Sequence, residues 1–289
     1  PEYIGITTKP YVNIGRMRNS GWDSSLQYDQ KIGQVNFSAM GNFTFARNVI
    51  EDQDQPDYIE KYMNRTGQAR WQTFGYVSDG LFKDEADIAT SPDQSALGEV
   101  RPGDIKYKDL NNDGVIDSKD VKAIGYTDVP EIVYGFGVSA QWKGFDVSVF
   151  FQGNAHVSFS INSSMVRGFT EPKMAANNVF SDIYGNYCTE SNTDAKYPRL
   201  TTTEATNNNQ SSDFWLVNGR YIRLKNAEFG YTFPKRLIQK MRLSQLRVFV
   251  SGTNLLTFAP FKLWDPDLQT GASNYPNTRV ANIGLNIGF

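Results

Sequence analysis

The sequence predicts an all-β fold, the C-terminal portion of a large antiparallel transmembrane β-barrel with long extracellular loops. Several segments alternate strictly between apolar and polar residues, which is the period of a strand with one apolar face. Aromatic residues make up 13% of the chain, a content that suits the aromatic girdles of a membrane barrel. No window of the sequence holds the roughly 18 consecutive apolar residues that a membrane helix needs, so a helical membrane protein is excluded.

The clearest predicted strand covers residues 35–45, where apolar residues or glycine occupy every second position. The same alternation fills 134–142 and 145–151, on the two sides of the turn Trp142-Lys-Gly144, and it predicts a hairpin. The alternation slips near Asn226, which indicates a bulge or a strand that rises above the bilayer. Further strands are expected at about 17–29, 214–233, 246–253 and 282–289, which gives about seven in all.

The connections between these strands are alternately short and long. Short connections are expected at about 29–34, 142–145 and 234–245, and long ones at about 50–130, 159–213 and 254–277. Outer-membrane barrels have short turns on the periplasmic side and long loops outside. We therefore expect the short turns and the C-terminal Phe289 to lie in the periplasm.

The chain is expected to be the C-terminal part of a longer protein. It opens at Pro1 with neither an initiator Met nor the basic and apolar regions of a signal peptide. About seven strands cannot close a lumen wide enough for a solute, because the smallest bacterial barrels already use about eight. The missing strands and a plug should therefore come from the same assembly.

Charge and reactive residues argue against several functions. The 29 Lys and Arg residues nearly balance the 31 Asp and Glu residues, without the basic stripe that a nucleic-acid partner requires. His156 and Cys188 are the only residues of their types, too few for a zinc site, an internal disulfide or the usual catalytic triads. We therefore predict that the chain is not an enzyme.

Glycines at residues 135 and 137, followed by Ala140, match the dinucleotide fingerprint, but that motif requires a following helix. A strand and a turn are predicted there instead, so we expect the two glycines on the crowded lumen-facing side of the barrel wall. The Asn-rich stretch 207–209 is predicted to be a mobile loop. The rings of Trp215, Tyr221, Trp264 and Tyr275 are expected to pack in loops or girdles in preference to stacking on a ligand.

One loop, within residues 101–125, has the spacing of a calcium site. Its oxygen ligands would occupy positions 1, 3, 5, 7, 9 and 12 of the calcium loop pattern, and Gly114 at position 6 would permit the sharp turn. The last ligand is Asp in place of the usual Glu, which predicts lower affinity. The other interpretation is a polar turn whose side chains cap the local backbone. The predicted ligands are Asp109, Asn111, Asp113, the Val115 carbonyl, Asp117 and Asp120.

Motifs along almost the whole chain resemble the C-terminal part of SusC/RagA-type TonB-dependent transporters of the Bacteroidota outer membrane. The block from residue 103 to 153 is specific to that family. The motifs that carry the resemblance include Gly75-Tyr-Val-Ser-Asp-Gly80-Leu-Phe82, Gly103-Asp-Ile-Lys-Tyr-Lys-Asp-Leu-Asn-Asn-Asp-Gly-Val-Ile-Asp117, Pro130-Glu-Ile-Val-Tyr-Gly-Phe-Gly137, Phe150-Phe-Gln-Gly153, Tyr221-Ile-Arg-Leu-Lys-Asn226 and Gly252-Thr-Asn-Leu-Leu256.

The resemblance implies import of an oligosaccharide or an oligopeptide across the bacterial outer membrane. It implies a SusD-like surface lipoprotein as a lid, and the TonB complex as an energy source that acts on a plug. Residues 1–289 would then be a partial TonB-dependent receptor β-barrel in contact with outer-membrane lipid, with plug and N-terminal strands elsewhere. The resemblance assigns no ligand-contacting residues to this chain beyond those of the calcium-like loop.

Three other functions remain open from the sequence. A siderophore or vitamin receptor would share the barrel but lack the lipoprotein lid, and the block at 103–153 argues against it. A calcium-dependent adhesin or structural barrel would lack transport, and a plug in the same assembly would exclude it. An outer-membrane enzyme of the phospholipase kind is disfavoured by the single histidine.

Overall fold

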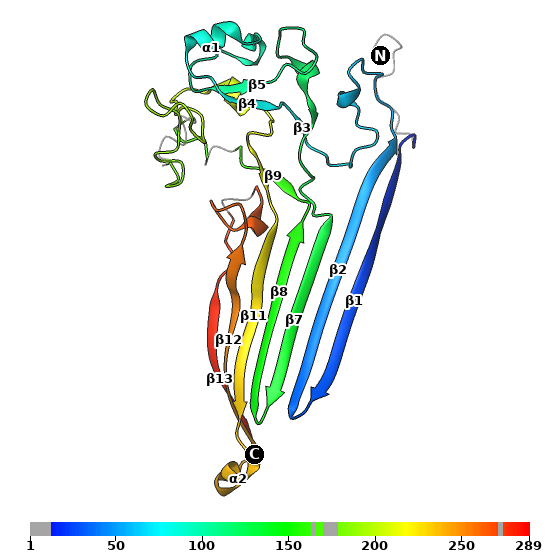
Figure 1. The fold of residues 1–289 in the computed structure, drawn as a ribbon, viewed down its shortest axis with the longest axis vertical. Coiled ribbons are helices and arrows are strands. Elements are labelled where there is room, and N and C mark those ends of the chain that lie inside the picture. Colours follow the sequence, from blue (N-terminus) through cyan, green and yellow to red (C-terminus); the bar gives the residue numbers. More distant parts are fainter. Residues whose placement is uncertain (1–12, 163–165, 170–178, 271–273) are drawn as a thin grey trace, which may run out of the picture.

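The computed structural model describes residues 13–162, 166–169, 179–270 and 274–289. The molecule is a tall antiparallel wall of seven strands with a folded loop region at one end (Figure 1). Neighbours in the wall follow one another in chain order. The strands are β1 (Arg16–Ile32), β2 (Val35–Asp52), β7 (Ile132–Trp142), β8 (Phe145–Ala155), β11 (Tyr221–Thr232), β12 (Gln245–Phe258) and β13 (Val280–Gly288).

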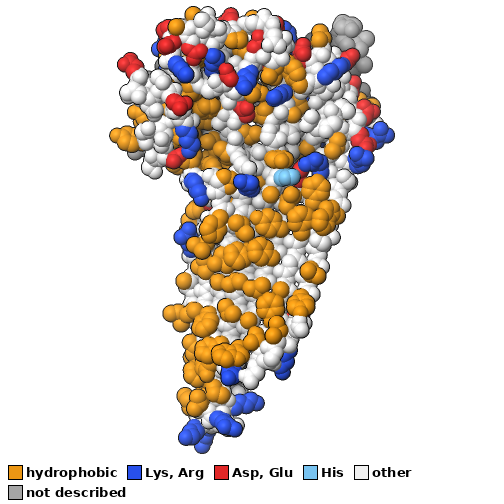
Figure 2. Space-filling model, viewed as in Figure 1, with side chains coloured by type: hydrophobic (Ala, Val, Ile, Leu, Met, Phe, Trp, Pro, Cys, Tyr) orange, Lys and Arg blue, Asp and Glu red, His pale blue; other side chains and the backbone are white. Residues whose placement is uncertain are grey.

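The pairing register gives the wall one apolar face and one polar face. Phe136 lies opposite Phe151, and Phe229 lies opposite Val250. Because directly paired residues of neighbouring strands point to the same side, the alternating apolar residues merge into a continuous apolar face. Figure 2 shows this face as a band of hydrophobic side chains over the strands. The polar face carries, among others, Asn42, Ser139, Ser148, Glu228 and Arg247.

The two glycines of the rejected nucleotide fingerprint lie on the polar face. A Cβ added to Gly135 or Gly137 would come within 2.8 or 2.9 Å of the Phe150 ring. The crowding predicted for these glycines is therefore confirmed, because the ring of Phe150 fills the space that two side chains would need.

Tight turns join the strands at the end of the wall away from the loop region. Lys143 and Gly144 have φ of 47° and 91°, the two positive values of a type I′ hairpin turn. The last turn before β12 contains α2 (Lys235–Ile238) and η7 (Gln239–Met241), which lie at the bottom of Figure 1. Among the helices in the described ranges, none is both long and apolar enough to cross a membrane.

The predicted strand at 214–233 is wrong in its first part. It divides into β10 (Leu216–Asn218), which pairs with β9 (Ser158–Ser160), and β11 in the wall. The Asn218 side chain accepts a hydrogen bond from the Arg220 N–H at 3.0 Å, which turns the chain between the two strands. The predicted slip in alternation is confirmed, since the register shifts between Leu224 and Asn226.

The long connections fold into one unit, which we call the loop domain. Most of the fully buried side chains gather here, among them Tyr107, Ile116, Phe159 and Trp215. The elements of the loop domain are η2 (Lys61–Met63), β3 (Phe74–Gly75), β4 (Ser78–Leu81), α1 (Glu85–Thr90), η3 (Ser95–Leu97), β5 (Ile105–Tyr107), η4 (Ser118–Asp120), β6 (Lys122–Ala123), β9, η6 (Thr206–Asn209), β10 and η8 (Pro266–Leu268).

Candidate functional site

The predicted calcium loop runs from the end of β5 into η4 and curls around one carboxylate. Asp109 accepts hydrogen bonds from the N–H groups of Asn112 at 2.6 Å and Gly114 at 2.7 Å. Asn112 and Gly114 have φ of 61° and 84°, so both adopt the left-handed conformation that a sharp turn requires. The loop is therefore preformed around its first predicted ligand.

The last predicted ligand, Asp120, joins the end of the loop to its beginning. Asp120 is fully buried, and its two carboxylate oxygens accept from the N–H groups of Leu110 at 2.7 Å and Asp117 at 2.9 Å. Asp117 in turn caps η4 by accepting from the Lys119 N–H at 2.7 Å. These contacts are the backbone-capping interactions of the alternative interpretation.

A lysine ammonium joins two of the predicted ligands. Lys119 Nζ lies 3.2 Å from the Asp113 carboxylate and 3.4 Å from the Asp117 carboxylate. Hydrogen bonds from the Asn111 side chain, the Val115 N–H and Lys119 hold the pKa of Asp113 below its ordinary value. Within the described ranges no three Asp, Glu, His or Cys side chains converge in a way that suits a metal. The structure thus pairs both Asp113 and Asp117 with the Lys119 ammonium, and it engages Asp109 and Asp120 with backbone N–H groups.

A buried polar network connects two long connections at the centre of the loop domain. Asn208 donates to the fully buried Asp104 at 2.8 Å and accepts from the Ile105 N–H at 2.8 Å. Asn207 is fully buried and accepts from Gln94 at 2.7 Å. The prediction of a mobile loop at 207–209 is wrong for Asn207 and Asn208, because both side chains are buried in this network. Sequence reasoning missed the network because its partners lie more than 100 residues apart along the chain.

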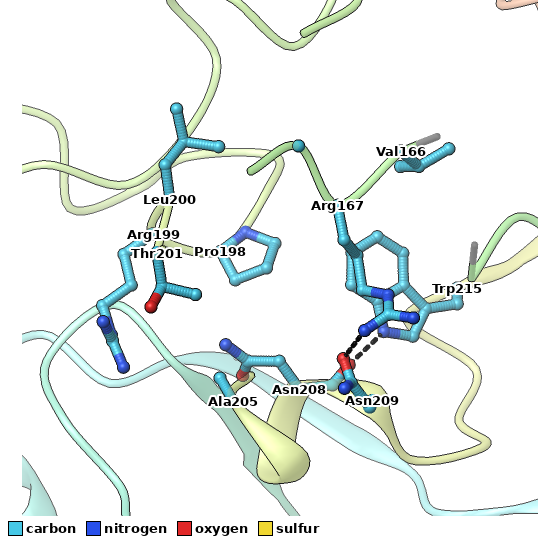
Figure 3. A pocket seen from close by; sticks show the side chains of 11 residues that line it. Val166, Arg167, Pro198, Arg199, Leu200, Thr201, Ala205, Asn208, Asn209 and Trp215 are labelled. Carbon is cyan, nitrogen blue, oxygen red and sulfur yellow. Dashed lines mark hydrogen bonds between the residues drawn. The ribbon is translucent and has the colours of Figure 1, made fainter. Parts of the chain in front are cut away.

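The small cavity beside Trp215 is a packing space. Figure 3 shows Arg167, Arg199 and Trp215 around it, with Asn208 and Asn209 on one side. The indole N–H of Trp215 donates to the Asn208 carbonyl at 2.7 Å. The volume is about 30 Å³, which is room for a water molecule and far below the size of a ligand pocket.

A larger cavity lies where the polar face of the wall meets the connection from β12 to β13. We call it the mouth cavity. Its volume is about 300 Å³, and the buried Arg223 forms its floor. This guanidinium pairs with Asp267 at 2.7 Å and with Asp265, and it donates to Thr257 at 3.0 Å. The remaining lining residues are Asn254, Ala259, Phe261, Lys262, Trp264, Pro266, Pro276, Asn277 and Arg279.

An adjoining cavity of about 350 Å³ has an aromatic lining, and we call it the aromatic cavity. Tyr197, Phe214 and Phe261 contribute rings, and Lys262 borders both this cavity and the mouth cavity. Asp182 closes one side. Its hydrogen bonds with Lys196 at 2.9 Å and Tyr197 at 3.0 Å lower the pKa of the carboxyl.

The predicted ligand-stacking candidates have different environments. Trp215 and Tyr221 are buried, and Trp264 packs edge-to-face on Phe261 with ring centres 4.7 Å apart. Tyr275 is 83% exposed. Packing therefore accounts for Trp215, Tyr221 and part of the Trp264 ring, whereas the ring of Tyr275 is free to contact a solute.

His156 and Cys188 have different contacts, and no contact joins them among the described residues. His156 follows β8 and lies 3.1 Å from Glu131, with its ring stacked on Tyr126. Cys188 is buried, and burial together with the charge of Asp104 raises the pKa of its thiol. A thiol with a raised pKa is a poor nucleophile at neutral pH. His156 lies just beyond the end of a wall strand, on the side of the loop domain.

Comparison with known proteins identifies receptors, not enzymes. No family model matches the chain. TonB-dependent receptor P3 of Formosa agariphila is 28% identical, and the match covers all of this chain and 30% of that receptor. TonB-dependent receptor P26 of the same organism is 26% identical over all of this chain and 31% of its own length. The prediction that the chain is not an enzyme agrees with these relatives.

Solved structures confirm the predicted fold. The RagAB peptide importer in its open-open state aligns with all of this chain at a TM-score of 0.72 and 22% identity. The closed-closed state aligns with a TM-score of 0.70 and 22% identity. The chain covers 30% and 31% of those two structures. The described strands are thus a portion of a large antiparallel β-barrel.

Proposed function

Because this chain matches part of the TonB-dependent receptors of the SusC/RagA type over its whole length, we propose that it forms barrel wall and outer loops of an importer in the bacterial outer membrane. The observation that carries the proposal is the antiparallel wall with one apolar and one polar face. The apolar face would contact lipid, and the polar face would line the lumen.

The loop domain would face outward, with the short turns and the C-terminus in the periplasm. The unequal connections support this orientation, since barrels of this kind keep their long loops outside. The rest of the barrel and the plug would complete the lumen. The TonB complex would act through the plug, and a SusD-like lipoprotein would cover the loop domain.

The imported solute would be an oligosaccharide or an oligopeptide. Import of peptides is what the similar RagAB proteins do. The aromatic cavity supports either class, because aromatic rings pack against the faces of sugars and against apolar peptide side chains. The chain spans about a third of the relatives it matches, so the whole assembly is needed for transport.

We also propose that the loop within 101–125 binds calcium. The supporting observations are the spacing of the oxygen ligands and the backbone curled around Asp109. Calcium would replace the Lys119 ammonium beside two carboxylates and stiffen the loop, without a catalytic role. The proposed ligands are Asp109, Asn111, Asp113, the Val115 carbonyl, Asp117 and Asp120.

Purification of the native assembly tests the import proposal. Outer membranes are extracted in mild detergent, and every co-eluting chain and small molecule is identified by mass spectrometry. We expect the remaining barrel strands, a plug and a SusD-like lipoprotein, with a bound glycan or peptide. A plug without a lipoprotein would favour a siderophore or vitamin receptor. A barrel with neither would favour an adhesin or structural role and overturn the proposal.

A further inference from the structure

We propose that the mouth cavity binds an anionic group of the imported solute, so that the importer prefers oligomers that carry carboxylates or sulfates. The inference rests on the proposed import function and adds a substrate preference to it. Arg223 pairs in register with Gln152 and Thr257 on the polar face. The cavity therefore opens toward the side of the wall that would line the lumen.

The charge balance of the connection supports an anionic ligand. Residues 254–279 contain two acids, Asp265 and Asp267, and two bases, Lys262 and Arg279. Both acids are engaged by the buried Arg223. Lys262 and Arg279 line the same cavity and form no ion pair within the described part of the chain. Three cations therefore face two carboxylates, and the two unpaired cations are the exposed ones.

A further polar atom of the lining lacks a partner. Asn254 has a left-handed backbone with φ of 53°, and its side-chain N–H donates to the Thr278 carbonyl at 3.0 Å. Its Oδ1 is buried without a hydrogen bond among the described residues. A buried acceptor without a donor is costly, so a side-chain movement that exposes this oxygen to a hydroxyl or N–H of a bound solute would relieve that cost.

The size of the cavity fits one unit of an oligomer. A volume of about 300 Å³ is at the lower end of small-molecule pockets. The neighbouring aromatic cavity, which shares Lys262 and Phe261, could take the next unit. The two cavities together would form one extended site. The cations of the mouth cavity would bind the anionic unit, and the rings of the aromatic cavity would pack against the next unit.

Binding to the full receptor, purified with its lipoprotein, tests this proposal by calorimetry. The probes are a trimeric oligogalacturonate and a neutral trimeric hexose oligomer, with an acidic and an uncharged tripeptide as a second pair. We expect at least about tenfold tighter binding of the acidic member of one pair, as charge-assisted hydrogen bonds provide. The pair that shows the preference identifies the source of the anionic group.

The double variant Lys262→Gln with Arg279→Gln should abolish most of that preference. The matched control is Lys235→Gln with Arg236→Gln in α2, which removes the same charge at the opposite end of the wall. A second measurement needs no variant. Raising the salt concentration should weaken binding of the acidic probe and leave binding of the neutral probe unchanged.

Equal binding of acidic and neutral probes would overturn the charge preference and leave import intact. Equal losses in the double variant and the control would overturn the placement in the mouth cavity. Absence of binding by all four probes would overturn the anion-binding proposal. A native assembly that contains neither plug nor lipoprotein would overturn the import function itself.

Discussion

Asn208 donates a hydrogen bond to the buried carboxylate of Asp104 at 2.8 Å, although 104 residues separate the two in the chain. The same carboxylate pairs with Arg199 at 2.8 Å. Asp104 belongs to the connection before β7, whereas Asn208 and Arg199 belong to the connection before β11. The contact therefore fastens two long loops to each other and keeps the loop domain in one piece above the wall.

Replacement of Asn208 by Leu should loosen the loop domain. The change removes one hydrogen bond from Asp104, which keeps Arg199, and it leaves the Ile105 N–H without a partner. An unsatisfied buried group costs about 1–3 kcal/mol. In the full receptor, limited proteolysis of the loop domain should become about tenfold faster or more, because cleavage follows the population of the open state. The control is Asn274→Leu, at an exposed position. Equal proteolysis of both variants would contradict the structural role of Asn208.

The wall could be predicted from sequence because its signal is local. Strict alternation places apolar residues on one face whatever the partner strand is, and the predicted hairpin around Lys143 appears as expected. The slip of alternation near Asn226 also carries its own signal, since a bulge adds one residue to a strand. Strand ends were less predictable, because backbone hydrogen bonds extend β2 as far as Asp52.

The loop domain could not be predicted in the same way. Burial of Asn207 and Asn208 depends on partners from another connection, and no periodic pattern marks such contacts. In the calcium-like loop the spacing located the turn and its Gly114 correctly. The spacing gave no sign that Lys119 would lie between Asp113 and Asp117, because a side-chain contact of this kind follows from the fold of the loop.

The hairpin turn between β7 and β8 should tolerate no side chain at Gly144. This residue has φ of 91°, and an added Cβ would lie 2.6 Å from the Thr232 carbonyl oxygen. Gly144→Ala should therefore cost more than about 1 kcal/mol of stability and lower the midpoint of heat-induced unfolding of the purified barrel. Gly33→Ala provides the comparison, since that turn also has positive φ but open space around it. A larger loss at Gly33 would show that crowding at Gly144 is unimportant.

Acid should weaken the contact between α1 and β5. Asp87 accepts from Lys106 at 2.9 Å and from the Lys83 N–H at 3.1 Å, and these contacts lower the pKa of its carboxyl. A lowered folded-state pKa means that the contribution is present above the unfolded value of about 3.9 and is lost as the pH falls through the folded value. Protection of the α1 amides from hydrogen exchange, corrected for intrinsic rates, should therefore fall below about pH 4.

The substitution Asp87→Asn should remove most of that pH dependence. Glu85→Gln is the matched control, because Glu85 is exposed on the same helix and forms no ion pair among the described residues. If both variants keep the acid-dependent loss of protection, another group controls the opening of α1.

Calcium and Lys119 should compete for the same carboxylates. In the calcium-like loop the Lys119 ammonium lies 3.2 Å from Asp113 and 3.4 Å from Asp117, so a bound cation would have to displace it. Lys119→Met should therefore tighten calcium binding about three- to tenfold, from the dissociation constant of about 10⁻⁴ to 10⁻³ M expected for a weak extracellular site. Asp113→Ala should abolish binding, and Lys122→Met, just beyond the loop, should leave it unchanged.

Calcium titration of the full receptor by calorimetry distinguishes the two interpretations of this loop. If wild type and Lys119→Met both fail to bind, the carboxylates serve only to cap the backbone.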